Sequence, residues 1–227
     1  MKKVVLSVII LAFVLSASAL AVTRFYLPST GTAAVSPVFT TAGWGDTTTG
    51  APDRIRCLTH KTNSAITNKA VTVNSSSLTV LNRQYVSDPI AAQTIGGTVQ
   101  GQLIGACSKT TYSSITIRIV SAEGTMVRGT LLAIKNGTFA YPDPTAANRY
   151  TPVPGTALTV VTPESGDRIV IEIGFDRTAT GNTATNQYFG DNGTTDLGSN
   201  ESETSTTANP WVEFSQDIKF PSVSVND

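Results

Sequence analysis

The sequence predicts an all-β protein that forms a single β-sandwich of jelly-roll-like design. β-branched residues are abundant, and long helix formers are scarce. Short stretches of alternating apolar and polar residues recur along the chain, separated by glycine, proline and polar turns. About 200 residues follow the N-terminal leader, which is more than an immunoglobulin-type domain needs, and the connections are uneven in length. These features favour a jelly roll over an immunoglobulin-type sandwich.

The clearest alternation lies in the second half of the chain. Ile115, Ile117 and Ile119 fall on one face of a predicted strand, with Thr116 and Arg118 on the other. A short turn over 122–124 predicts a hairpin into the next strand. The full set of expected strands is 24–27, 55–58, 70–73, 78–86, 94–104, 115–119, 126–134, 169–175, 188–189 and 212–220. Glycines within 94–104 indicate a bulge or a close backbone approach.

The first 21 residues have the layout of a secretory signal peptide. Met1–Lys3 is basic, Val4–Leu15 is apolar apart from one serine, and Ala19-Leu20-Ala21 is a small-residue cleavage site. We expect cleavage after Ala21 and a secreted, extracellular protein. The alternative is an uncleaved anchor, because Val4–Val22 carries no charge and is just long enough to span a bilayer. The predicted organisation is a signal peptide over 1–21, a sandwich over 22–220 and a frayed tail over 221–227.

The composition argues against two classes of partner and allows one disulfide. Charged residues make up 14% of the chain and the formal net charge is zero, so neither nucleic acid nor an anionic membrane is an expected partner. In an exported protein Cys57 and Cys107 can form a disulfide. Closing their loop of about fifty residues would contribute roughly 3–4 kcal/mol. The alternative is two unconnected buried thiols.

Few residues suggest catalysis, and we predict that the protein is not an enzyme. His60 is the only histidine, and no G-x-S-x-G motif or other nucleophile context accompanies it. Glu172 and Glu213 lie on predicted strands out of phase with the apolar residues, so they are expected to face solvent or a groove. Paired carboxylates on a jelly roll can hydrolyse glycosides. Two solubilising strand residues are the simpler interpretation.

Binding sites for calcium or sugar are weaker hypotheses. Acidic residues in the loop over 191–203 could ligate Ca²⁺, although their spacing does not match an EF-hand. These residues are Asp191, Asp196, Glu201 and Glu203. A plain surface loop is the alternative, and no other cofactor is expected. Trp44 and Tyr141, in predicted loops, are candidate platforms for stacking a sugar.

Six segments carry a resemblance to known sequences. They are Arg24-Phe-Tyr-Leu-Pro-Ser29, Arg83-Gln-Tyr-Val-Ser-Asp-Pro89, Gln93-Thr-Ile-Gly-Gly-Thr-Val-Gln-Gly-Gln102, Val127-Arg-Gly-Thr-Leu-Leu132, Gly166-Asp-Arg-Ile-Val-Ile-Glu-Ile-Gly174 and Asn209-Pro-Trp-Val-Glu-Phe214. In this order, over residues 23–220, they resemble a family of uncharacterised proteins common in tailed-phage and environmental viral sequences. The resemblance implies a virion-associated structural or surface-display β domain. Such relatives begin near the Arg-Phe-Tyr segment without a signal peptide, so this chain resembles an exported, host-encoded or prophage-derived version.

These observations predict a non-enzymatic, exported structural, surface-display or adhesive β domain that associates with itself or with other surface or virion proteins. One alternative is a carbohydrate-binding module or a glycan-active enzyme of jelly-roll type. Another is a filament subunit that assembles by β-strand addition at the edge formed by Arg24–Tyr26.

Overall fold

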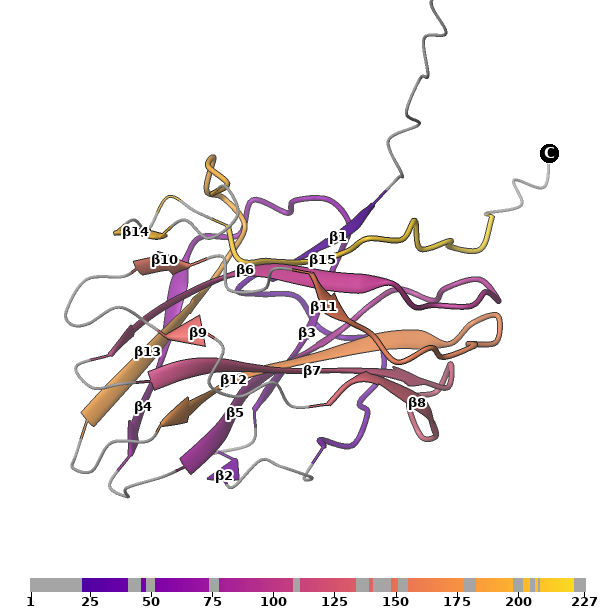
Figure 1. Ribbon diagram of the computed structural model, residues 1–227, viewed down its shortest axis with the longest axis horizontal. Helices are drawn as coiled ribbons and strands as arrows, with labels where there is room; N and C mark the ends of the chain where they lie inside the picture. The colour runs from indigo at the N-terminus through magenta and orange to yellow at the C-terminus, as the bar shows by residue number, and fades with distance from the viewer. Residues whose placement is uncertain are drawn as a thin grey trace, which may run out of the picture.

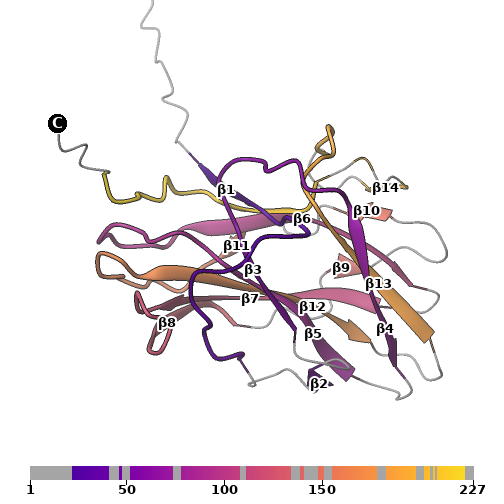
Figure 2. The ribbon, with the colours of Figure 1, turned by 180° about the vertical axis from the view of Figure 1, so that it is seen from behind.

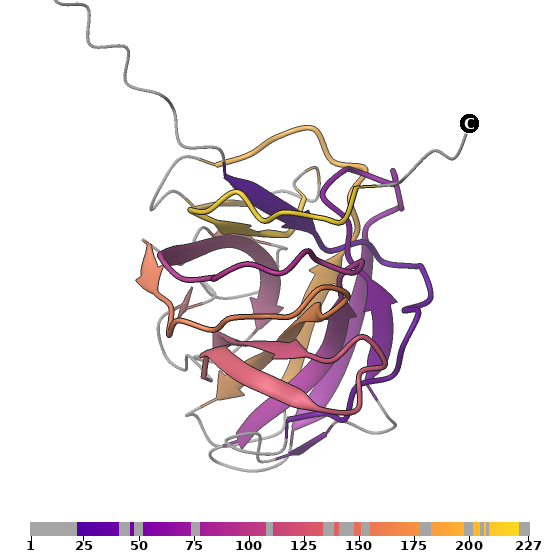
Figure 3. The same ribbon diagram turned by 90° about the vertical axis from the view of Figure 1, so that its right-hand side faces the viewer.

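The computed structural model describes residues 22–40, 46–47, 52–73, 78–107, 111–133, 139–140, 148–150, 155–177, 183–197, 202–204, 207 and 209–222. These residues form two packed β-sheets, with β1, β15 and β6 in one layer and β5, β12 and β7 in the other (Figures 1 and 3). Within them no helix is long and apolar enough to cross a membrane. The predicted all-β sandwich is confirmed, while the predicted signal peptide lies outside the described residues.

The first sheet is antiparallel and has β6 (Thr98–Cys107) at its centre. β6 pairs with β15 (Trp211–Phe214), which pairs with β1 (Thr23–Tyr26), so the first and last strands of the sandwich are neighbours. The other members are β10 (Asn148–Tyr150), β14 (Ser202–Thr204), β11 (Thr156–Ala157), β13 (Thr183–Phe189) and β4 (Thr67–Val73). Gly101 lets β6 pass close to β15, because a Cβ there would lie 3.1 Å from the Trp211 carbonyl oxygen.

The second sheet has β12 (Arg168–Arg177) at its centre, between β5 (Leu78–Val86) and β7 (Thr111–Val120). β8 (Val127–Leu132) and β9 (Phe139–Ala140) pair with β7. The short strands β2 (Asp46–Thr47) and β3 (Asp53–Arg56) run parallel to β5, whereas the other pairs are antiparallel. The chain passes repeatedly between the sheets, for example from β5 to β6, from β6 to β7 and from β12 to β13, as in a jelly-roll-like sandwich.

The core lies between the sheets and follows the alternation of the strands. Ile117 and Ile171 from the second sheet and Val212 from the first are fully buried in it. At one side the two sheets are joined by segment 159–161, because Thr159 N–H donates to the Leu131 carbonyl of β8 and Val161 bridges Ile95.

The outer face of the second sheet is covered by residues 35–40, which we call the N-terminal strap. The strap's Pro37 carbonyl accepts hydrogen bonds from Arg54, whose guanidinium lies 3.9 Å from the centre of the Phe39 ring. Its Val38 carbonyl accepts a bond of 2.8 Å from Arg118. The strap therefore removes from solvent a sheet face that the alternation alone would leave exposed.

Candidate functional site

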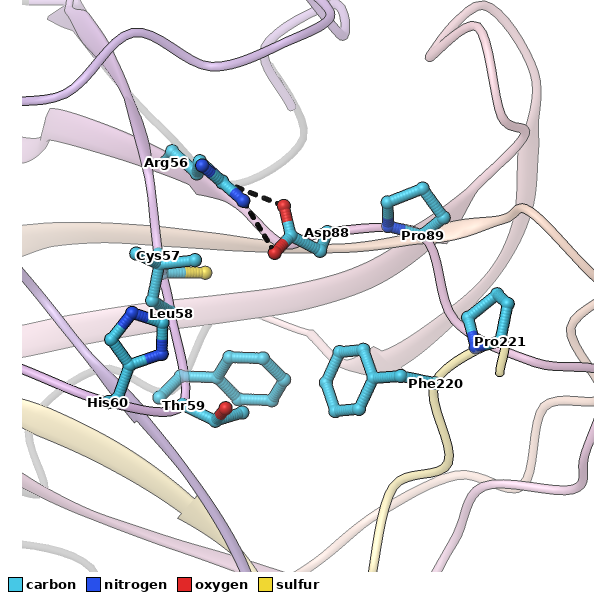
Figure 4. Close-up of a pocket in the computed structure, with 10 residues that line it drawn as sticks. Arg56, Cys57, Leu58, Thr59, His60, Asp88, Pro89, Phe220 and Pro221 are labelled. Atoms are coloured by element: carbon cyan, nitrogen blue, oxygen red, sulfur yellow. Dashed lines mark hydrogen bonds and ion pairs between the residues drawn. The ribbon is translucent and has the colours of Figure 1, made fainter. Parts of the chain in front are cut away.

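A cleft of about 500 Å³ lies beside β1 in the described part of the chain. Four segments that are distant in sequence line it: Phe25 of β1, residues 57–60 after β3, residues 88–89 after β5 and residues 220–221 after β15 (Figure 4). Its walls are mainly apolar, and the rings of Phe25 and Phe220 meet edge to face at 6.4 Å. Phe220 is 37% exposed, so part of its ring borders the solvent at the cleft.

Polar groups stand at the margins of this cleft (Figure 4). Arg56 holds Asp88 through two parallel bonds, both of 2.7 Å, and both side chains are partly exposed. The hydrogen bond to Asp88 is the main reason that the pKa of Arg56 is raised. His60 is exposed, and no described residue forms a hydrogen bond with its side chain. The cleft thus holds one planar ion pair and one histidine, without a nucleophile–base–acid series.

Cys57 lies in the wall of the cleft as a buried, free thiol. Burial raises the pKa of the thiol far above its ordinary value, so the sulfur stays protonated and is a poor nucleophile. The disulfide predicted between Cys57 and Cys107 is not formed in this structure. Cys107 is the last residue of β6, where it lies opposite Thr185. The cleft that contains Cys57 lies near the other end of β6, where Val99 pairs with Phe214.

Stability is expected to fall as the pH rises above about 9. Burial raises the pKa values of Cys57 and Tyr85 far above their ordinary values of 9.0 and 10.0. The folded protein keeps both groups neutral while the unfolded chain ionises. Their contribution is therefore complete well below pH 9.0, and it falls progressively as the pH rises above 9.0 for Cys57 and above 10.0 for Tyr85 toward their raised folded-state pKa values. Denaturant melts from about pH 7 to about pH 11 would measure the loss. Cys57→Ala should remove the part that begins near 9.0; an unchanged profile would contradict this account.

Glu172 and Glu213 are not exposed, contrary to the expectation from their phase. Glu172 is fully buried beneath the strap, where one oxygen, Oε1, accepts bonds from Thr40 N (2.9 Å), Gln84 Nε2 (3.0 Å) and Arg118 Nη2 (2.8 Å). No described group bonds its other oxygen, Oε2. The alternation along β12 correctly predicted that Glu172 points away from the core. The strap, which is distant in sequence, covers that outer face of the sheet.

Glu213 is 8% exposed and lies on the outer face of the first sheet. It accepts bonds from Arg24 (2.8 Å) and Gln100 (2.6 Å). The two glutamates therefore project from opposite outer faces of a sandwich whose sheets pack about 10 Å apart. That arrangement is too wide for the carboxylate pair of a glycosidase, which needs about 5–9.5 Å.

Arg24 is the centre of a second polar cluster. Its guanidinium lies 4.0 Å from the centre of the Trp211 ring and pairs with Asp196 and Glu213. Partial burial by itself would lower the pKa of Arg24, but the bonds to Asp196 and Glu213 raise it. Asp196 also accepts a bond of 3.1 Å from the Trp211 indole. These contacts fasten residues 195–197 against β1 and β15.

Asp191 fastens another loop. Its buried carboxylate accepts bonds from the backbone N–H groups and the hydroxyls of both Thr62 and Ser64, at 2.5–3.1 Å. Gly190 beside it has φ +146, and a Cβ there would lie 2.7 Å from the Ala65 carbonyl oxygen, so only glycine allows this approach. We call this contact the Asp191 clasp.

The calcium hypothesis gains no support from these contacts. Asp191 and Asp196 bind protein donors, Glu201 lies outside the described residues, and so does the side chain of Glu203. Among the described residues no three His, Cys, Asp or Glu side chains lie close enough to hold a metal ion. The sugar-platform candidates Trp44 and Tyr141 also lie outside the described residues. The cleft was missed from sequence; its one local signal is Phe220, an aromatic residue beyond the last strand.

Comparisons with known proteins leave the family open. No family model matches the chain, and no curated protein matches it. Among solved structures, an α-amino acid ester hydrolase is similar at a TM-score of 0.36 and 10% identity, over 87% of this chain and 36% of that one. The structure of infectious bursal disease virus, Gx strain, is similar at a TM-score of 0.29 and 12% identity, over 66% of this chain and 33% of that one. This chain thus spans about a third of each, and such low scores support no functional argument.

Proposed function

We propose that the protein is a non-enzymatic, exported β domain that serves as a structural or adhesive surface component and associates with further copies of itself or with other surface or virion proteins. The observation that carries the proposal is the cleft beside β1. It offers an exposed phenylalanine and apolar walls next to an edge strand. The export and the phage-like origin rest on the leader and on the sequence resemblance.

The chemistry of the charged residues supports this proposal. Glu172, Glu213, Asp191 and Asp196 each hold a strap, a strand or a loop in place. The thiol in the cleft is kept protonated by burial, and the histidine at its margin stands without a described partner. These four carboxylates therefore hold separate segments of the chain together, which is what a rigid structural subunit needs.

Carbohydrate binding is the second candidate, and the same cleft favours it. Aromatic rings next to a polar, planar ion pair are the elements with which proteins stack and hydrogen-bond a sugar. Phe25 and Phe220 supply the rings, and Arg56 with Asp88 supplies the polar pair. This assignment places the sugar platform in the cleft and not at Trp44 or Tyr141.

One set of measurements separates the two candidates. We expect the purified exported protein to form oligomers by size-exclusion chromatography with light scattering, and to pass unretarded through columns of immobilised polysaccharides. A protein that stays monomeric at all concentrations and is retained on a polysaccharide would overturn the structural proposal. Phe220→Ala should then abolish retention, whereas Met126→Ala, at another exposed apolar residue, should leave it unchanged.

A further inference from the structure

β1 has one paired edge and one largely open edge. Leu27 N–H donates to the Pro210 carbonyl on the β15 side. Backbone N–H and carbonyl groups alternate in direction along a strand. Those of Tyr26 and Arg24 therefore point away from β15, to the outer edge of β1. There Tyr26 N–H donates to the Leu58 carbonyl at 2.9 Å, but no described residue bonds the backbone of Arg24. Among the described residues, pairing on the outer edge thus stops after one bond, and the backbone N–H and carbonyl of Arg24 can pair with another strand.

A groove runs along this open edge. The cleft of about 500 Å³ adjoins a second hollow of about 390 Å³, since Thr59 and Phe220 line both. The second hollow is also lined by Val22 and Arg24 of the open edge and by Ile218. We call the two together the β1-edge groove. It provides what strand addition uses: free peptide groups for affinity and side-chain hollows for specificity.

The chain carries a segment with the right pattern at the right place. Residues 222–227 read Ser-Val-Ser-Val-Asn-Asp, in which Val223 and Val225 share one face of an extended strand and the serines share the other. This segment starts directly after Phe220 and Pro221, which themselves line the groove. The segment that follows β15 accordingly ends on the same side of the molecule as the start of β1 (Figure 2), and Val22 and Phe220 line one hollow.

The groove of the same molecule is a poor site for its own segment. Ile218 N–H donates to the Thr23 hydroxyl at 2.7 Å, and Lys219 is held by Gln93 and Ala91, so the chain already runs past β1 before it reaches Pro221. Turning back toward Arg24 would take about four residues. A second copy approaches from outside and has no such restriction.

We infer that residues 223–227 of one molecule add as a strand to the β1-edge groove of a second copy, with Val223 and Val225 facing the apolar hollows. The donor segment follows shortly after Phe220 and Pro221, which line the acceptor groove of their own molecule. Two copies therefore exchange segments about a two-fold axis, and the exchange closes a dimer instead of extending a filament. This inference rests on the proposed self-association and names the site and the partner for it.

The test compares the purified exported protein with the same chain ending at Ser222. We expect the full chain to be a dimer by light scattering and the shortened chain to be a monomer with an unchanged thermal melt. Val223→Asp with Val225→Asp should act like the truncation. The matched control, Ser222→Asp with Ser224→Asp, adds the same charge on the opposite face and should remain dimeric. A shortened chain that stays dimeric overturns the inference while leaving the proposed self-association intact.

A peptide experiment identifies the groove itself. A synthetic peptide of residues 222–227, added to the shortened chain, should shift the amide NMR signals of Arg24 and Thr59, and a peptide with both valines replaced by serine should not. Absence of a shift with the natural peptide overturns the inference. If the full chain is monomeric but its Arg24 signal already matches the peptide-bound form, its own segment fills the groove, which overturns the second-copy assignment. If the full chain is monomeric without that match, the proposed self-association fails as well.

Discussion

Replacing Glu172 with alanine is expected to lower the free energy of unfolding by about 3–5 kcal/mol. The substitution leaves the guanidinium of Arg118, whose side chain is 7% exposed, without its carboxylate. It also removes the acceptor for the Thr40 N–H, which holds the end of the strap against β12. A buried charge without a partner is the main source of the loss. Urea denaturation followed by tryptophan fluorescence measures it.

Two further variants show that the loss arises from the unpaired charge. Replacing both Glu172 and Arg118 with methionine should recover most of the stability, since an apolar pair of similar volume leaves no buried charge. Glu164→Ala is the exposed control, because Glu164 pairs with Arg128 while its side chain is 68% exposed. It should cost less than about 1 kcal/mol. Equal losses for Glu172→Ala and Glu164→Ala would contradict the account.

Replacing Asp191 with alanine is expected to cost about 3 kcal/mol, because hydrogen bonds to a buried charged acceptor contribute about 1.5–3 kcal/mol each and are partly replaced by water. The clasp holds Thr62 and Ser64, which follow the cleft-lining residues 57–60 directly in the chain. The loss should therefore be accompanied by a looser cleft wall. Hydrogen exchange at the amides of Thr62 and Ser64 reports the opening directly, and the unfolding midpoint in urea reports the cost.

Asp191→Asn keeps one acceptor oxygen and should cost less than the alanine variant. Asp217→Ala is the surface control: its carboxylate is 44% exposed and pairs with the neighbouring Lys219. We expect it to leave stability within about 1 kcal/mol of the native chain. Unchanged exchange at Thr62 and Ser64 in Asp191→Ala would show that the clasp does not hold the loop.

The strands that could be predicted are those with one face in the core, because apolar and polar residues then alternate along the sequence. Residues 78–86 match β5 at both ends, and the alternating isoleucines located β7 and β12 correctly. Strands of two or three residues, such as β9 and β11, carry too little pattern to be recognised. The last strand ends at Phe214 and not at 220, since Ser215 turns to bond Thr98 and Ile218 reaches the core from irregular chain.

The site could not be predicted for a different reason. The cleft joins Phe25, Cys57, Asp88 and Phe220, which no local spacing connects. The phase of Glu172 correctly predicted an outward side chain, but alternation along a strand says nothing about a strap from another part of the chain. Hydrogen bonds between residues 54 to 132 positions apart bury Glu172, and single-sequence patterns do not contain such bonds.

The pairing of β1 with β15 also determines when folding can finish. Arg24 and Glu213, which bond across these strands, are 189 residues apart in the chain. At a synthesis rate of about 5–20 residues per second, the earliest strand waits about 10–40 s for its partner. Strand pairs separated this far also close slowly, because the loop between them must be ordered first. A chain with this topology cannot complete its sandwich until its last strand has been synthesised. It therefore remains incompletely folded through most of its synthesis.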